Sequence, residues 1–387
     1  MSGDPSSYGY VQIMEEIAES AKLNMNESDI LKVFAVSGAI LQSVLGIFLK
    51  HAHGNSDLAL LAVIYNLVKY TAPVFIFAIV YGMVKGNQHT KTGHFYKEKF
   101  YELVIPYFLW ATASLIFIPS LQVNRHATSF WSLIESYVVG NSSSQYWYTV
   151  MMLQFQVLMP VLIYTCYKFL SKPSRVIPLL VVSFLFFGAW LWMYDTYVFH
   201  GVYATSLRYL DRFFVSYFIY GLLGGIAWVY KDKFDGILHR IQFILIPVML
   251  LLLIWTNREF FSFGFEDMSF GNLIYLKPSM TLYSLVVIAL IYMLARHLLL
   301  VQSRTLPFYK WLSTYAYRAF TANVFILYVV LKLFGGLVDQ LPFLVALVLV
   351  YLTTVACSFC VVYGFAKGYS LIKRTFMKNE MAVQAEH

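Results

Sequence analysis

Long apolar segments alternate with short polar connections along most of this chain. Ten such segments lie between Ile30 and Ala366, most of them 17 to 25 residues long and nearly without charge. About 20 apolar residues in a helix cross the hydrocarbon core of a bilayer. The pattern therefore predicts ten membrane spans, which are Ile30–Phe48, Leu58–Met83, Leu103–Pro119, Trp147–Tyr167, Val176–Met193, Phe213–Val229, Ile241–Trp255, Ser279–Leu300, Leu312–Leu333 and Phe343–Ala366.

The spans are predicted to be helices. Each segment must satisfy its own backbone hydrogen bonds in lipid, and none shows the alternation of polar and apolar residues that marks a barrel strand. Ile241–Trp255 is the weakest span, because it is short and contains Pro247. We therefore expect an all-α polytopic membrane protein with about ten transmembrane helices in one bundle.

Composition supports this class of protein. Hydrophobic residues make up 59% of the chain and charged residues only 12%. Such a composition is typical of a membrane protein rather than of a soluble domain. A soluble enzyme is therefore excluded, and membrane lipid is the expected surrounding.

Basic residues are distributed unequally between the two predicted faces of the membrane. Seventeen Lys and Arg side chains lie on one face and seven on the other. Basic loops face the cytoplasm in most membrane proteins. The even span count then predicts a multi-pass protein of the cell membrane with both termini cytoplasmic. The net charge of +8 is explained by this asymmetry and by anionic lipid headgroups, so no nucleic-acid partner is expected.

The connections on the predicted outer face are longer and rich in aromatic residues. They are Ser120–Tyr146, Tyr194–Arg212 and Thr256–Pro278. Aromatic rings pack against the faces of sugars, but they also form the ordinary aromatic belt at a membrane interface. Both interpretations, a glycan-binding surface and an interfacial belt, stay open at this point.

Charged side chains within the spans are the first candidates for function, because each is costly in lipid unless it faces a cavity or a partner. Lys32 and Arg318 lie near span ends and can extend to the headgroups. Lys69 lies about eleven residues inside its span. Asp211 and Arg212, at the outer start of the sixth span, are either a structural ion pair or a polar cluster that binds sugar.

Common enzymatic motifs are absent from the sequence. It has no phosphate-binding loop, no G-x-S-x-G and no H-E-x-x-H, and we expect no metal cofactor. Most histidines lie in loops. His51 and His53 are weak candidates for a catalytic base, since they follow the first span at its outer mouth.

Six motifs stand in a characteristic order along the chain: Asp29–Val33, Tyr70–Phe77, Lys97–Trp110, Tyr146–Phe155, Phe218–Gly225 and Lys277–Tyr283. Their order, spacing and topology resemble the ten-helix membrane acyltransferases of acyltransferase family 3. The resemblance covers about residues 28 to 372. It is closest to the subgroup linked to intercellular-adhesion poly-N-acetylglucosamine, described either as its export protein or as its O-succinyltransferase.

The resemblance implies roles for particular residues. In the family, an Arg at the cytoplasmic start of span one is followed, after ten intervening residues, by a His that handles acyl transfer from acyl-coenzyme A. Here these positions hold Lys32 and Ser43, and a second family His in span nine falls on Asn323. The resemblance places Lys32 and Lys99 at the coenzyme A phosphates. It places Trp147, Arg208 and Arg212 near the glycan.

The resemblance also implies a domain plan: a cytoplasmic N-terminal extension (1–28), a ten-helix acyltransferase-like membrane domain (29–372) and a cytoplasmic tail (373–387). Two functions remain open. The first is an O-acyltransferase that moves an acetyl or succinyl group from cytoplasmic acyl-coenzyme A to a secreted or cell-surface polysaccharide. The second, favoured by Ser43 and Asn323, is a non-catalytic export or accessory protein for such a polysaccharide. A membrane glycosyltransferase is an expected partner. An unrelated transporter is a third class.

Overall fold

The structure, a computed structural model, describes residues 25–52, 54–86, 92–121, 129–265, 270 and 274–385. Helices dominate these residues, and none of them forms a strand. Nine helices in this part of the chain are long and apolar enough to cross a membrane, and Phe130–Val139 and Phe214–Val229 are shorter apolar segments. The predicted all-α polytopic bundle of about ten helices is confirmed.

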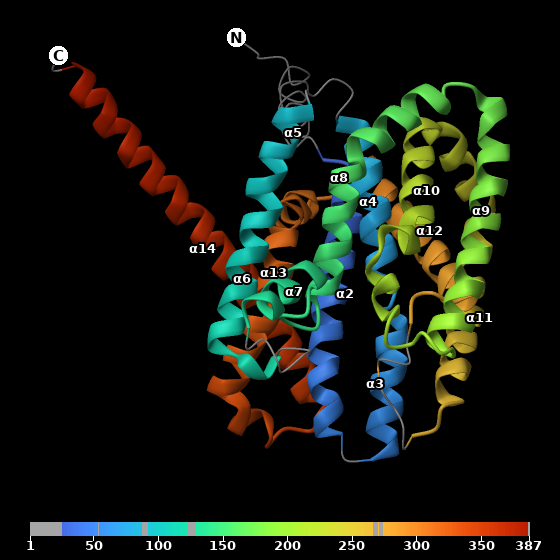
Figure 1. Cartoon of the computed structure of the whole chain (residues 1–387), viewed down its shortest axis with the longest axis horizontal. Coiled ribbons are helices and arrows are strands. Elements are labelled where there is room, and N and C mark those ends of the chain that lie inside the picture. Colours follow the sequence, from blue (N-terminus) through green and yellow to red (C-terminus); the bar gives the residue numbers. More distant parts are fainter. Residues whose placement is uncertain are drawn as a thin grey trace, which may run out of the picture.

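The helices of the bundle follow one another with short connections (Figure 1). They are α2 (Glu27–Phe48), α3 (Asn55–Leu67), α4 (Thr71–Gly86), α5 (Thr92–Lys99), α6 (Ile105–Phe117), α7 (Phe130–Val139), α8 (Tyr146–Phe169), α9 (Val176–Met193), α10 (Phe218–Val229), α11 (Lys231–Phe261), α12 (Pro278–Leu300), α13 (Leu306–Val338) and α14 (Phe343–Ala385). A π-helical turn, Phe100–Val104, joins α5 to α6.

Successive membrane-crossing segments run up and down the bundle, with α4 continuing in the direction of α3, so most connections between segments lie toward one of two ends (Figure 1). The start of α2 and the far part of α14 lie at the same end, at the top of Figure 1. We call this the Glu27 end, and we call the opposite end, where α2 finishes, the Phe48 end. This arrangement agrees with an even number of crossings.

The start of α2 is fixed by its sequence. The Asn26 side chain accepts a hydrogen bond from the Ser28 backbone N–H at 2.8 Å, and the Asp29 carboxylate accepts one from the Asn26 backbone N–H at 3.2 Å. Such a reciprocal cap satisfies donors that the first helical turn leaves without partners. The helix therefore begins with its acidic residues at the membrane boundary.

Predicted and observed ends differ for several spans, including Leu58–Met83 and Ile241–Trp255. The predicted span Leu58–Met83 is divided into α3 and α4 by a turn at Val68–Tyr70. The predicted span Ile241–Trp255 is only the middle of α11, which has 31 residues and keeps Pro247 inside it. Hydropathy underestimated α11 because its charged first turns continue the helix beyond the apolar segment.

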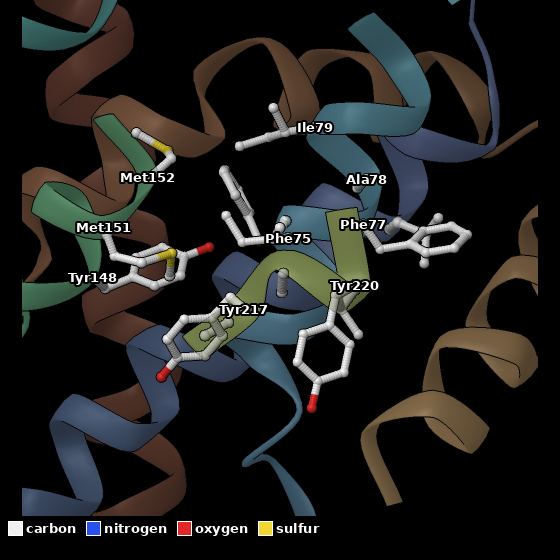
Figure 2. Close-up of a cluster of buried hydrophobic side chains, with 14 of the residues drawn as sticks. Phe75, Phe77, Ala78, Ile79, Tyr148, Met151, Met152, Tyr217 and Tyr220 are labelled. Atoms are coloured by element: carbon white, nitrogen blue, oxygen red, sulfur yellow. The ribbon is translucent and has the colours of Figure 1, made fainter. Parts of the chain in front are cut away.

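The core is centred on α4, which packs against α10, α2 and α8. Figure 2 shows Phe75 and Phe77 of α4 among Tyr148 and Met152 of α8 and Tyr220 of α10, all of them buried. The contact with α10 is close because Gly224 leaves room for backbone. A Cβ added at Gly224 would lie 2.4 Å from the Phe77 carbonyl oxygen.

Candidate functional site

The interruption between α3 and α4 is held by side chains from other helices. The Gln42 amide of α2 donates to the Val68 carbonyl at 2.8 Å. The Tyr283 hydroxyl of α12 donates to the Leu67 carbonyl at 2.7 Å. Backbone groups released by a break inside a membrane need such partners. The break is therefore an organised part of the bundle, and it lies directly beside α2.

A cavity of about 430 Å³ opens next to this break, in the half of the bundle toward the Phe48 end. This volume falls in the range of small-molecule sites. Its wall combines hydroxyl and amide groups with large rings. The lining residues are Ala39, Gln42, Ser43, Gly46, Ile47, Leu49, Lys50, Tyr65, Thr71, Ser120, Ser144, Gln145, Trp147, Tyr148, Phe270, Tyr275, Phe320 and Val324.

Ser43 and Trp147, two of the residues singled out by the sequence, meet in this cavity. The Ser43 hydroxyl donates to the Ala39 carbonyl, one turn earlier in α2, at 3.2 Å. The Trp147 ring lies 5.7 Å from the Tyr275 ring, measured between centroids. The structure therefore brings the position of the family histidine and a predicted sugar-binding ring to one cavity wall.

Tyr275 links the loop before α12 to the helix break. Its hydroxyl shares a hydrogen bond with the Thr71 hydroxyl at 2.9 Å. Burial raises the pKa of the Tyr275 phenol, so it stays protonated at neutral pH. The cavity thus presents neutral hydroxyl and amide groups between aromatic surfaces, an arrangement that suits a neutral, hydroxyl-rich ligand.

The predicted donor residues lie at the Glu27 end. Lys32 pairs with Asp29 at 3.8 Å, and the same Asp29 pairs with Lys310 of α13 at 3.2 Å. Lys99 pairs with Glu102 at 2.5 Å. Lys99, Lys310 and Glu102 all interact electrostatically with the Lys32 ammonium group. The structure therefore brings Lys32 and Lys99 into one basic cluster and adds Lys310, which the sequence did not single out.

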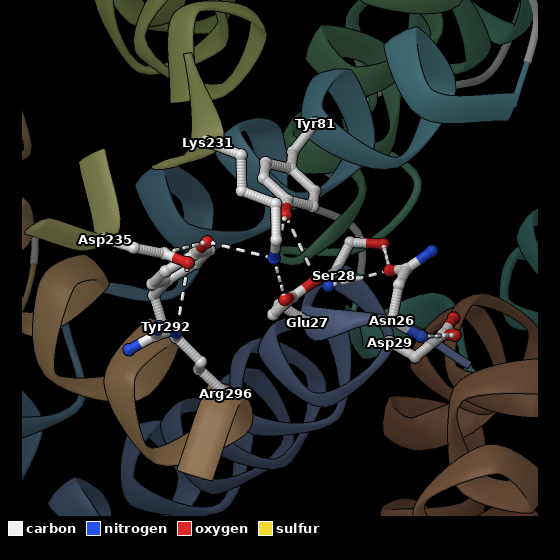
Figure 3. Close-up of polar contacts among 9 residues, drawn as sticks. All are labelled: Asn26, Glu27, Ser28, Asp29, Tyr81, Lys231, Asp235, Tyr292 and Arg296. Atoms are coloured by element: carbon white, nitrogen blue, oxygen red, sulfur yellow. Dashed lines mark hydrogen bonds and ion pairs between the residues drawn. The ribbon is translucent and has the colours of Figure 1, made fainter. Parts of the chain in front are cut away.

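A second polar network at the Glu27 end was not predicted from the sequence. Figure 3 shows Glu27 bound to Lys231 of α11, with the Tyr81 hydroxyl of α4 donating to the Glu27 carboxylate at 3.0 Å. The Tyr292 hydroxyl donates to the Asp235 carboxylate at 2.8 Å, and Arg296 pairs with Asp235 at 2.9 Å. Glu27, Lys231 and Asp235 stood outside the predicted spans, and Arg296 stood near the end of the predicted span Ser279–Leu300.

The other predicted site residues lie away from the cavity lining. The Arg212 guanidinium donates to the Val139 carbonyl and to the Asn141 side chain, and it stacks on the Tyr209 ring at 4.6 Å. Those contacts tie the loop after α7 to the chain before α10. His51 is exposed, and its ring nitrogen lies 3.2 Å from the Ile47 carbonyl oxygen.

Three further positions were singled out by the sequence. His53 lies outside the described residues, and only the backbone of Arg208 is described, in a 3₁₀ turn. Asn323 is buried in α13, where its amide donates to the Phe320 carbonyl. Within the described part of the chain, no three His, Cys, Asp or Glu side chains gather in a way that would hold a metal ion.

Comparison with known proteins identifies the family. A family model described as an acyltransferase domain (Acyl_transf_3) matches residues 25–363. Because the match covers most of the chain, the protein belongs to acyltransferase family 3. No curated protein and no solved structure matches it.

Proposed function

We propose that this protein is a membrane O-acyltransferase that moves an acetyl or succinyl group from cytoplasmic acyl-coenzyme A to a hydroxyl of a secreted or cell-surface polysaccharide. Membership of the acyltransferase family supports acyl transfer in general. The observation that carries the choice of acceptor is the cavity at Ser43. Its rings and neutral hydrogen-bonding groups match a sugar, which has apolar faces and many hydroxyls.

The basic cluster at the Glu27 end is the proposed donor site. Lys32, Lys99 and Lys310 lie near one another, and in this proposal their ammonium groups bind the coenzyme A phosphates. Lys32 and Ser43 are eleven residues apart on α2. At 1.5 Å per residue they are separated by about 16 Å along the helix. An extended pantetheine arm along α2 would bring the thioester toward the cavity.

The proposal requires an orientation in the membrane. We infer that the Glu27 end faces the cytoplasm, because the more basic set of predicted loops lies there. Single cysteines at His94, at the Glu27 end, and at Ser262, at the Phe48 end, test this on a background without Cys166, Cys357 and Cys360. A membrane-impermeant thiol reagent added to intact cells should label only the Ser262→Cys variant, and labelling of His94→Cys alone would reverse the orientation.

An accessory role in polysaccharide export is the second candidate. Two observations favour it: the Ser43 hydroxyl is bonded within its own helix, and the buried Asn323 replaces the second family histidine with a group that is not a base. In this role the protein would assist a membrane glycosyltransferase in secreting a poly-N-acetylglucosamine-like polymer. The subgroup of the family is likewise part of the proposal.

Acyl transfer by the purified protein tests the first function. The full chain in lipid nanodiscs, which leave both faces accessible, is mixed with acetyl- or succinyl-coenzyme A and an N-acetylglucosamine oligosaccharide. Mass spectrometry should detect an ester on the oligosaccharide and an equal amount of released coenzyme A. The absence of ester with both donors would favour the accessory role.

A further inference from the structure

Lys69 lies in the turn that separates α3 from α4. Its side chain is only 4% exposed. The ammonium nitrogen lies 4.4 Å from the centre of the Tyr275 ring and 5.0 Å from the centre of the Tyr65 ring. Both rings belong to the wall of the Ser43 cavity. Lys69 is therefore held at the cavity boundary by the two rings.

This lysine has no carboxylate beside it. Among the residues that the structure describes, none forms a salt bridge with Lys69, and the charged groups that act on it at longer range are Lys277 and Asp211. Ring faces attract a cation, but more weakly than a carboxylate in contact. An ammonium without such a partner is expensive inside a membrane, and the neutral amine avoids that cost.

The cavity lining offers few groups that could accept a proton. Its described lining includes no His, Asp or Glu. Lys50 also lines the cavity, but it is exposed in the 3₁₀ turn Leu49–His51 that follows α2. Tyr275 stays protonated, and Ser43 has no base bonded to it. Acyl transfer to a hydroxyl nevertheless needs a group that takes the proton.

We propose that Lys69 is the catalytic base of this acyltransferase, a role that rests on the function proposed above. The acceptor hydroxyl oxygen forms a bond to the acyl carbonyl carbon while its proton passes to the neutral Lys69 amine. The carbon–sulfur bond of the thioester then breaks. The resulting ammonium returns the proton to the leaving thiolate, so that coenzyme A departs as a thiol and Lys69 is again neutral.

The surroundings of Lys69 match this role. Gln42 lines the cavity next to Ser43. Its amide also donates to the Val68 carbonyl and so fixes the turn that carries Lys69. Tyr275 is fixed in turn by Thr71 at the start of α4. The turn and the two lining rings hold the amine next to the cavity wall, and no carboxylate contacts it among the described residues. A buried lysine in apolar surroundings is a recognised form of base or nucleophile.

Three substitutions at one position separate a base from a structural cation. The full chain in nanodiscs is assayed with acetyl-coenzyme A and an N-acetylglucosamine oligosaccharide, at equal amounts of monodisperse protein. Lys69→Met should lower the transfer rate at least 100-fold, the usual scale for loss of a general base. Arginine stays protonated and cannot accept a proton, so Lys69→Arg should be equally impaired. Lys69→His should recover at least tenfold over Lys69→Met, since imidazole is a base near neutrality.

The control is Lys332→Met, which removes an exposed lysine of α13 and should leave the rate within twofold of wild type. Transfer by Lys69→Arg within threefold of wild type would overturn the proposal, because a charge would then suffice. Lys69→His no faster than Lys69→Met would also overturn it. Lys69→Arg keeps a long basic side chain between the two rings, so it decides the matter even where Lys69→Met does not accumulate. Wild type without transfer would instead contradict the proposed function itself.

Discussion

Buried ionisable side chains near the two ends of helix α2 have different kinds of partner. At the Glu27 end, Glu27 binds Lys231 and Tyr81, and Asp29 binds Lys310 and the Ser313 hydroxyl. Toward the Phe48 end, Lys69 is more deeply buried than Lys231, and among the described residues it contacts two ring faces and no carboxylate. In the first region the charged side chains form contacts between helices. In the second region an amine lies beside a cavity.

This difference indicates which polar groups serve the fold and which serve chemistry. Paired charges that join several helices fix the arrangement of the bundle. A buried amine without an anionic neighbour contributes little to that arrangement and is instead available to a ligand. The following variants test the distinction, beginning with the largest expected effect.

Glu27→Gln should destabilise the protein by about 3 kcal/mol, because it leaves the Lys231 ammonium and the Tyr81 hydroxyl without their carboxylate. Equilibrium unfolding in detergent measures the loss. The exposed Glu98→Gln is the matched control and should change stability by less than about 0.5 kcal/mol. Equal stability of the two variants would show that the Glu27 network does not hold the bundle together.

Gly224→Ala should cost about 2 kcal/mol, since the new methyl group would meet the Phe77 backbone where α10 crosses α4. Gly188→Ala in α9 adds the same group where no atom lies within 4 Å, so its stability should equal that of wild type or exceed it slightly. The difference between their thermal unfolding midpoints measures the effect. An unchanged midpoint for Gly224→Ala would mean that the two helices are not in close contact.

Lys32→Ala and Lys99→Ala should each raise the KM for acyl-coenzyme A about tenfold. Loss of one charged contact to a phosphate is worth about 1.5 kcal/mol or more, and 1.4 kcal/mol corresponds to a factor of ten. Initial rates against donor concentration provide the measurement. Lys97→Ala, an exposed lysine of the same helix as Lys99, should leave KM unchanged. A double variant with the wild-type KM would remove both residues from the donor site.

Ser43→Ala should have the smallest effect. It removes a hydroxyl that is bonded within its own helix, so stability should change by less than about 0.5 kcal/mol and the transfer rate by less than twofold. Ser43→His, by contrast, restores a base at the family position and should raise the rate. A large loss of activity in Ser43→Ala would show that the hydroxyl takes part in the reaction and would weaken the case for Lys69.

The sequence predicted the spans well where an apolar segment and a helix have the same ends. The predicted span Val176–Met193 coincides with α9. The break at Val68–Tyr70 was missed because apolar residues continue across it and because its supports, Gln42 and Tyr283, come from other helices. A hydropathy pattern contains no information about such distant partners.

The candidate site was predictable only in part, for the same reason. Ser43, Trp147 and Lys69 were each identified, from family spacing or from a charge within a span. Ser43 and Trp147 line one cavity, and Lys69 lies next to it through the ring of Tyr275, which is more than 200 positions away from Lys69. Likewise, Glu27 and Lys231 both stood next to predicted spans, and only the packing of α2 against its neighbours reveals the pair.

The most direct test of acyl transfer is made in the cell. Surface polysaccharide from a deletion strain and from the complemented strain is collected, quantified and analysed by mass spectrometry for ester groups per sugar. An acyltransferase predicts that polymer still leaves the deletion strain but carries fewer esters, and that wild-type protein restores them while Lys69→Arg does not. Polymer retained inside the deletion strain, with unchanged ester content in whatever escapes, would contradict this account and establish the accessory role.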